Sequence, residues 1–172
     1  NFSVDDFSAS ADLNNFQGSA DFVLNASILE NYIKAPCTMK IINLDSKKSS
    51  FLPESFAIEL DSPKIESNAF KKLVPLHVKV LRSPGRWDLM TDEKLGLIGE
   101  YLDEGIVNLS VDSSKPITFN LSGSIKNQIM DFALKEIDID ASYFANLINN
   151  DFFALYKGVA KGELTISGLI TD

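Results

Sequence analysis

Residues 130–140 read MDFALKEIDID, and the alternation within this stretch determines the kind of fold that the chain can form. Every second residue up to Leu134 is apolar, so in an extended strand the apolar side chains share one face. Ile137 and Ile139 keep the same spacing with the opposite parity. We therefore predict a half-buried strand that is interrupted by a β-bulge near Lys135-Glu136.

The same period-two alternation runs through most of the chain, with apolar residues on one side and polar residues on the other. This pattern is typical of antiparallel sheets that have one face in water. Turn-forming residues occur at Ser83-Pro84-Gly85 and over residues 14–18, which indicates hairpins. Further strands are expected over residues 21–28, 56–60, 74–81, 87–90, 107–111, 117–121 and 163–167.

Two segments depart from the β pattern. Between Thr91, which suits a helix N-cap, and Gly105, apolar residues recur at helical spacing, and this predicts a helix over residues 92–104. The same spacing predicts one or two short helices over residues 141–156, and residues 44–53 have the composition of a loop. The expected fold is mainly β: an antiparallel curved sheet built from repeated units, with one or two short amphipathic helices.

A partial internal repeat supports this architecture. Phe56-Ala57-Ile58 is followed by Ile65-Glu66-Ser67, and Phe132-Ala133-Leu134 is followed at a similar distance by Ile139-Asp140-Ala141. Repeated units bury their apolar faces against one another, which favours an elongated array over a catalytic globule. We interpret residues 1–172 as a single β-rich segment of a longer repeat protein. The approximate repeat units are residues 14–90 and 91–170.

Composition narrows the classes of function. The 172 residues are 45% hydrophobic and 23% charged, which fits a folded protein with a core. A formal net charge of -8 argues against binding to nucleic acid and against electrostatic docking on anionic headgroups. The single Cys37 excludes an internal disulfide and a cysteine-based metal site. No stretch reaches the roughly 18 consecutive apolar residues of a membrane-spanning helix.

Few residues suggest chemistry. His77 is the only histidine and lies on the polar side of its strand, without a second metal ligand or a triad partner. Asp138 and Asp140 share one strand face, where a solvated surface explains them better than a Ca²⁺ site or an acid–base pair. Cys37 is expected to fill space, and the glycines of residues 96–105 do not form a phosphate-binding loop. We predict no enzyme activity, no metal and no cofactor.

The remaining candidate site is the apolar face itself. Such a face must contact a second sheet, a helix or a hydrophobic ligand, and the alternation alone does not distinguish a filled sandwich from an open groove. The candidate groove residues are Phe22, Leu24, Phe56, Ile58, Leu76, Val78, Leu109, Phe119, Leu121, Phe132, Leu134, Leu164 and Ile166.

The C-terminal third carries a family resemblance. Residues 132–140, then Tyr143-Phe144 and Leu147, then a strand over residues 162–168 with glycine at both ends, resemble the repeat of AsmA-like and TamB-like bacterial envelope proteins. The resemblance is clearest over residues 117–170. Members of this family are long, groove-shaped β structures that are anchored at the inner membrane and project through the periplasm.

The resemblance implies a non-catalytic segment that binds or conducts phospholipid acyl chains in a hydrophobic β-groove and supports outer-membrane biogenesis. Its implied partners are phospholipid or another acyl-chain lipid and other envelope proteins, and its implied location is the periplasm. Two alternatives stay open: a structural or adhesive β-sandwich module of a cell-surface protein, and a ligand-binding barrel of the lipocalin kind.

Overall fold

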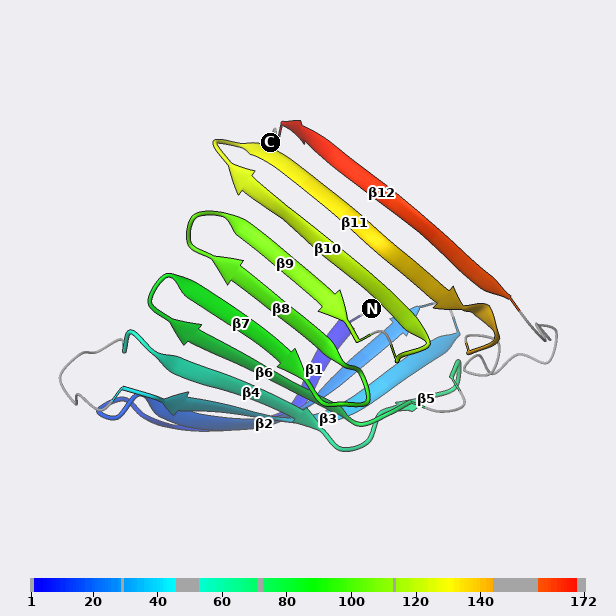
Figure 1. Ribbon diagram of the computed structural model, residues 1–172. Coiled ribbons are helices and arrows are strands. Elements are labelled where there is room, and N and C mark those ends of the chain that lie inside the picture. The colour runs from blue at the N-terminus through cyan, green and yellow to red at the C-terminus, as the bar shows by residue number, and fades with distance from the viewer. Residues whose placement is uncertain are drawn as a thin grey trace. The chain divides into compact units, whose positions relative to one another are not determined.

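The chain is mainly β. The computed structural model describes residues 2–28, 30–45, 53–70, 73–112, 114–143 and 158–169, and these residues form twelve strands (Figure 1). They divide into two compact units, one with the described residues up to Pro84 and the other with those from Gly85 onward. The predicted repeat units have a different boundary and stay a prediction.

The first unit contains six strands, and its pairings are antiparallel. Four of its strands follow one another in the order β1-β2-β3-β4, β6 pairs with β4, and the short β5 pairs with β3. A turn over residues 13–16 joins β1 to β2, as the sequence predicts. The strands are β1 (Phe2–Asp12), β2 (Gln17–Ile28), β3 (Asn31–Asn43), β4 (Phe56–Ser62), β5 (Glu66–Ser67) and β6 (Leu76–Ser83).

The second unit is an antiparallel meander of six strands in sequence order, which run as one layer from β7 to β12 in Figure 1. Connections of two to five residues join neighbouring strands from β7 to β11. The strands are β7 (Arg86–Thr91), β8 (Leu97–Leu102), β9 (Ile106–Val111), β10 (Ile117–Lys126), β11 (Ile129–Asp140) and β12 (Val159–Leu169).

All the strands expected from alternation are confirmed, whereas β1, β3, β8 and the two-residue β5 are additional. Alternation in β1 is broken at Asp6, which has a positive φ of 52° and lies at a register shift. The inward positions of β3 include Ala35 and Cys37, which are small, and Pro36 lies between them. These residues weaken the hydrophobic signal on which strand prediction depends.

The predicted helix over residues 92–104 is wrong. The carboxylate of Asp92 accepts hydrogen bonds from the backbone N–H groups of Lys94 and Leu95, at 3.1 Å each, as a helix N-cap would. The N–H of Gly96 then donates to the Asp92 carbonyl, and Gly96 adopts a left-handed φ of 63°. This conformation ends the helix-like segment after a single turn. The chain then continues as β8, which pairs with β7 and β9.

The second predicted helical segment is described only at its start, where residues 141–143 are helical. The rest of that prediction, including Phe144 and Leu147, lies outside the described residues. Most of the predicted loop over residues 44–53 also lies outside them. The proposed equivalence of the two repeat copies at this junction therefore stays a prediction.

Neither unit has a core of large side chains in the part of the chain that the structure describes. The buried hydrophobic residues there are all small: Ala20, Ala35, Cys37 and Ala57. Large apolar residues stay partly exposed, and several exceed 40% exposure, among them Phe2, Phe7, Ile98, Leu164 and Ile166. Close-packed interiors bury such side chains almost completely. Within each unit, the described residues therefore include no second layer over these strands.

Close packing within the single layer predicts unequal effects of two glycine substitutions. A Cβ added to Gly123 would collide with the Asp131 carbonyl oxygen and with Phe132 Cδ1, whereas one added to Gly162 has nothing within 4 Å. Gly123→Ala should lower the free energy of unfolding by about 1–3 kcal/mol because two strands must separate. Gly162→Ala should change it by less than about 0.5 kcal/mol.

Urea denaturation followed by the fluorescence of Trp87, the single tryptophan, measures both variants. Equal losses of stability at the two positions would contradict the packing between β10 and β11.

Candidate functional site

Strand register collects the predicted apolar residues of the second unit on one face. Residues directly opposite each other in an antiparallel pair have their side chains on the same side of the sheet. One such row crosses all six strands: Leu89, Gly99, Leu109, Leu121, Leu134 and Leu164. A second row lies two residues away: Trp87, Tyr101, Val107, Gly123, Phe132 and Ile166.

A β-bulge in β11 keeps this face apolar along its whole length. Between Leu134 and Ile137 the strand advances three residues while each neighbouring strand advances two, and Glu136 has a left-handed φ of 53°. The extra residue returns Ile137 and Ile139 to the side that carries Leu134. The predicted bulge is therefore confirmed. Phe119 lies on this same face because β10 is regular between it and Leu121.

Charge is confined to the opposite face of the second unit. None of the residues that the register places on the apolar face is charged. On the other face, Asp88, Glu100 and Asn108 lie directly opposite one another on β7, β8 and β9. We call the uncharged side of β7–β12, defined by the two rows above, the apolar face.

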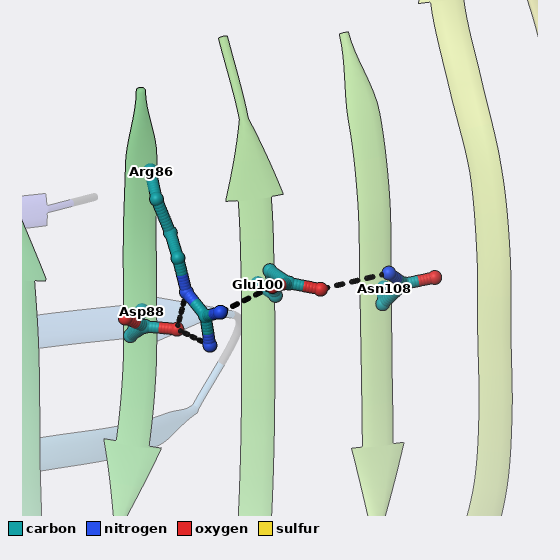
Figure 2. A network of polar contacts seen from close by, with 4 residues as sticks. All are labelled: Arg86, Asp88, Glu100 and Asn108. Atoms are coloured by element: carbon teal, nitrogen blue, oxygen red, sulfur yellow. Dashed lines mark hydrogen bonds and ion pairs between the residues drawn. The ribbon is translucent and has the colours of Figure 1, made fainter. Parts of the chain in front are cut away.

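Figure 2 shows how the polar side is organised. Arg86 Nη1 lies 2.9 Å from Glu100 Oε1, and Arg86 Nε donates to Asp88 Oδ1 at 2.7 Å. Asn108 Nδ2 then donates to Glu100 Oε2 at 3.0 Å, so the contacts cross three strands. Solvent-exposed pairs of this kind add little to stability, and water solvates their charged groups.

The first unit separates its side chains less completely, because Arg82 lies on the same side as its apolar candidates. Phe22 lies opposite Cys37, and Phe56 lies opposite Asn43 and Arg82. Two further rows of this unit are apolar: Ala20, Met39, Leu60 and Val78; and Gly18, Ile41, Ile58 and Val80. By alternation, the candidates of this unit share the side of these rows: Phe22, Leu24, Phe56, Ile58, Leu76 and Val78.

His77 and Cys37 each contact a neighbouring residue of the first unit. His77 Nδ1 contacts the carboxylate of Asp61 on the polar side of the first unit, where both side chains are about two-fifths exposed. Cys37 is buried, and its thiol donates to the Ala35 carbonyl at 3.3 Å.

The two aspartates of β11 have separate partners. Asp138 Oδ2 lies 2.9 Å from Lys161 Nζ. The Asp140 carboxylate accepts one hydrogen bond from the Ser142 hydroxyl and another from the Ser142 backbone N–H. These bonds, that of the hydroxyl most, lower the pKa of Asp140. Within the described ranges, no group of three or more His, Cys, Asp or Glu side chains is placed to hold a metal ion.

A hollow of about 600 Å³ lies beside the bulge. Its apolar lining includes Val111, Phe119 and Ile137, and its polar lining includes Glu136 and Lys161. Phe119 is among the candidates predicted from sequence, whereas Ile137 is not. The change of parity in residues 130–140 is the signal that places Ile137 on the same face. The strand β3, which carries Met39 and Ile41 of the first unit, was also missed.

Comparisons with protein-family models, with curated proteins and with solved structures find no match to this chain. The part of the chain that the structure describes includes no helix with the length and apolar character needed to cross a membrane. The resemblance to AsmA-like and TamB-like proteins stays a prediction, and the residues of the apolar face carry the functional argument.

The left-handed backbone of Glu136 predicts opposite effects of two substitutions there. Glycine adopts this conformation without strain, so Glu136→Gly should preserve or raise the free energy of unfolding. Glu136→Val should lower it by about 1–2 kcal/mol because a β-branched residue is disfavoured at positive φ. Lys135→Gly serves as the matched control and should be destabilising, because glycine weakens an ordinary strand position.

Urea denaturation of the three variants provides the comparison. A loss of stability in Glu136→Gly as large as that in Lys135→Gly would contradict the bulge assignment.

Proposed function

We propose that the chain binds phospholipid acyl chains along the apolar face and has no catalytic role. We further propose that it is a segment of an AsmA-like or TamB-like envelope protein that acts in the periplasm, conducts lipid between the inner and outer membranes, and supports outer-membrane biogenesis. The observation that carries the proposal is an uncharged face of apolar side chains that no described residue of its own unit covers.

The chemistry of that face suits an acyl chain. A hydrocarbon tail offers no hydrogen-bonding groups, and the rows of β7–β12 contain no charged group that would be left unpaired beneath it. Leu164 and Ile166 are 50% and 46% exposed, so apolar area remains to be buried. Each methylene removed from water contributes about 0.8 kcal/mol, so a tail that contacts several strands binds favourably.

The polar network favours one side of the sheet as the side that faces water. Arg86, Glu100 and Asn108 form their network on the side away from the apolar face, where water can solvate them. A sheet with one wet face and one lipid-covered face needs this separation in every strand. Our proposal also includes other envelope proteins as partners of this segment.

The alternative of a filled β-sandwich has less support. A sandwich buries the inner residues of both sheets in a core about 10 Å thick. Among the described residues, the buried hydrophobic positions are limited to alanines and Cys37. An open groove accounts for this exposure, whereas a structural or adhesive module with a filled core does not.

A lysine on the apolar face should separate lipid binding from folding. Leu121 lies between Leu109 and Leu134 in the first row, and Ser122 is its neighbour on the polar side. Leu121→Lys should reduce co-purified phospholipid at least about tenfold, which corresponds to about 1.4 kcal/mol. Its stability should fall by less than the several kcal/mol of a buried unpaired charge, because the ammonium reaches water. Ser122→Lys, the matched control, should keep its phospholipid.

Native mass spectrometry of the purified chain measures bound phospholipid, and urea denaturation measures stability. If the unsubstituted chain carries and binds no phospholipid, or if Leu121→Lys unfolds the protein, the groove is wrong and the sandwich stands.

A further inference from the structure

One cation interrupts the apolar side of the first unit. Arg82 of β6 lies opposite Phe56 of β4, and the next residues of β6 on the same side are Val80, Val78 and Leu76. Among the described residues of β2, β3, β4 and β6, the register places no other charged side chain on this side. The Arg82 guanidinium therefore lies at one end of a strip of apolar residues.

The neighbouring charges of β4 and β6 lie on the opposite side of the sheet and are paired with each other. Lys79 Nζ lies 2.8 Å from Glu59 Oε1, and His77 contacts the Asp61 carboxylate. The two partners of each pair are directly opposite in register. No carboxylate of these two strands therefore shares the side of Arg82, where it would repel an anion.

Aromatic side chains lie beside Arg82. Residues directly opposite each other in an antiparallel pair have their Cβ atoms about 5 Å apart, so Phe56 is the immediate neighbour of Arg82. The Phe56 ring contacts the Phe16 ring edge to face, with 5.4 Å between the ring centroids. Arg82 and Phe56 are both half-buried. Partial exclusion of water lowers the local dielectric constant, which strengthens the attraction of the guanidinium for an anion.

We infer that Arg82 binds the phosphate group of a phospholipid whose acyl chain lies along β6 on this side of the first unit. The inference rests on the proposed lipid binding, to which it adds a defined position for a headgroup. A guanidinium offers five N–H donors in a planar fork that matches phosphate oxygens, so it can bind a phosphate and keep contacts within the chain. A phospholipid carries its charge at one end and hydrocarbon beyond it, as the strip from Arg82 to Leu76 requires.

The strip is long enough for one acyl chain. Arg82 and Leu76 are six residues apart in β6, which corresponds to about 20 Å along the strand. A bilayer has a hydrocarbon core about 30 Å thick, so the tails of one leaflet span about 15 Å. Val80, Val78 and Leu76 are half-buried, so a tail would remove further apolar area from water.

The net charge of the chain does not conflict with this site. A net charge of -8 opposes adhesion to an anionic membrane surface, which acts on the whole molecule. The inferred contact involves one phosphate and one guanidinium on a side without carboxylates of β4 or β6.

Substitution of Arg82 should remove the preference for a lipid with a phosphate. The unsubstituted chain should bind dioleoyl phosphatidic acid at least about tenfold more tightly than dioleoylglycerol, which has the same tails without the phosphate. Arg82→Gln should lose most of this preference and keep its affinity for dioleoylglycerol. Arg82→Lys, which keeps the charge without the fork, should retain part of it. Lys40→Gln, the matched control, removes an exposed cation on the opposite side of β3 and should retain all of it.

Native mass spectrometry with each lipid in detergent measures the affinities, and far-UV circular dichroism verifies that each variant is folded. The preference should persist in Leu121→Lys, which impairs the apolar face of the second unit, because Arg82 belongs to the first unit. Glycerol phosphate should bind far more weakly than phosphatidic acid, because it has no tail to bury.

Several results would overturn the inference and leave the proposed lipid binding intact. These are equal affinity of the unsubstituted chain for the two lipids, full preference in every folded Arg82 variant, equal losses in Arg82→Gln and Lys40→Gln, or loss of the preference in Leu121→Lys. Glycerol phosphate that binds as tightly as phosphatidic acid would identify a site for free phosphate and overturn the lipid assignment. A chain that binds neither lipid would contradict both proposals.

Discussion

The exposure of one apolar sheet face to water is the constraint on which the rest of the structure depends. In β7–β12, antiparallel register aligns leucine with leucine across the strands and leaves no charged residue among them. Leaving apolar surface in water is unfavourable by about 25 cal/mol per Å² relative to burying it. In a typical domain a second layer of secondary structure buries such a face. The described residues of this unit include no such layer, and we propose that a ligand takes its place.

The remaining features keep this face intact. The bulge at Glu136 restores Ile137 to the apolar side, without which the last third of β11 would present its polar residues there. Gly99 and Gly123 leave room for the leucine and phenylalanine side chains that lean over them from adjacent strands. The network of Arg86, Glu100 and Asn108 lies on the other side of the sheet.

Much of this arrangement was predictable from sequence, because period-two alternation determines which side chains share a face. The bulge was predictable because Ile137 and Ile139 change parity relative to Leu134. The segment after Asp92 was mispredicted because its capping hydrogen bonds are common to a single turn and a helix. Only the positive φ of Gly96 and the pairing of β8 distinguish the two. What covers the apolar face is not encoded in alternation at all.

The fluorescence of Trp87 offers the most direct test of the central claim that acyl chains lie on the apolar face. Trp87 is the single tryptophan and belongs to the second row, opposite Tyr101. The chain is loaded with phospholipid whose acyl chains are brominated and, separately, with the same phospholipid without bromine. The account predicts that Trp87 is quenched strongly by the brominated tails alone, because bromine quenches only at close contact. Equal fluorescence with both lipids, in a chain shown to have bound them, would contradict it.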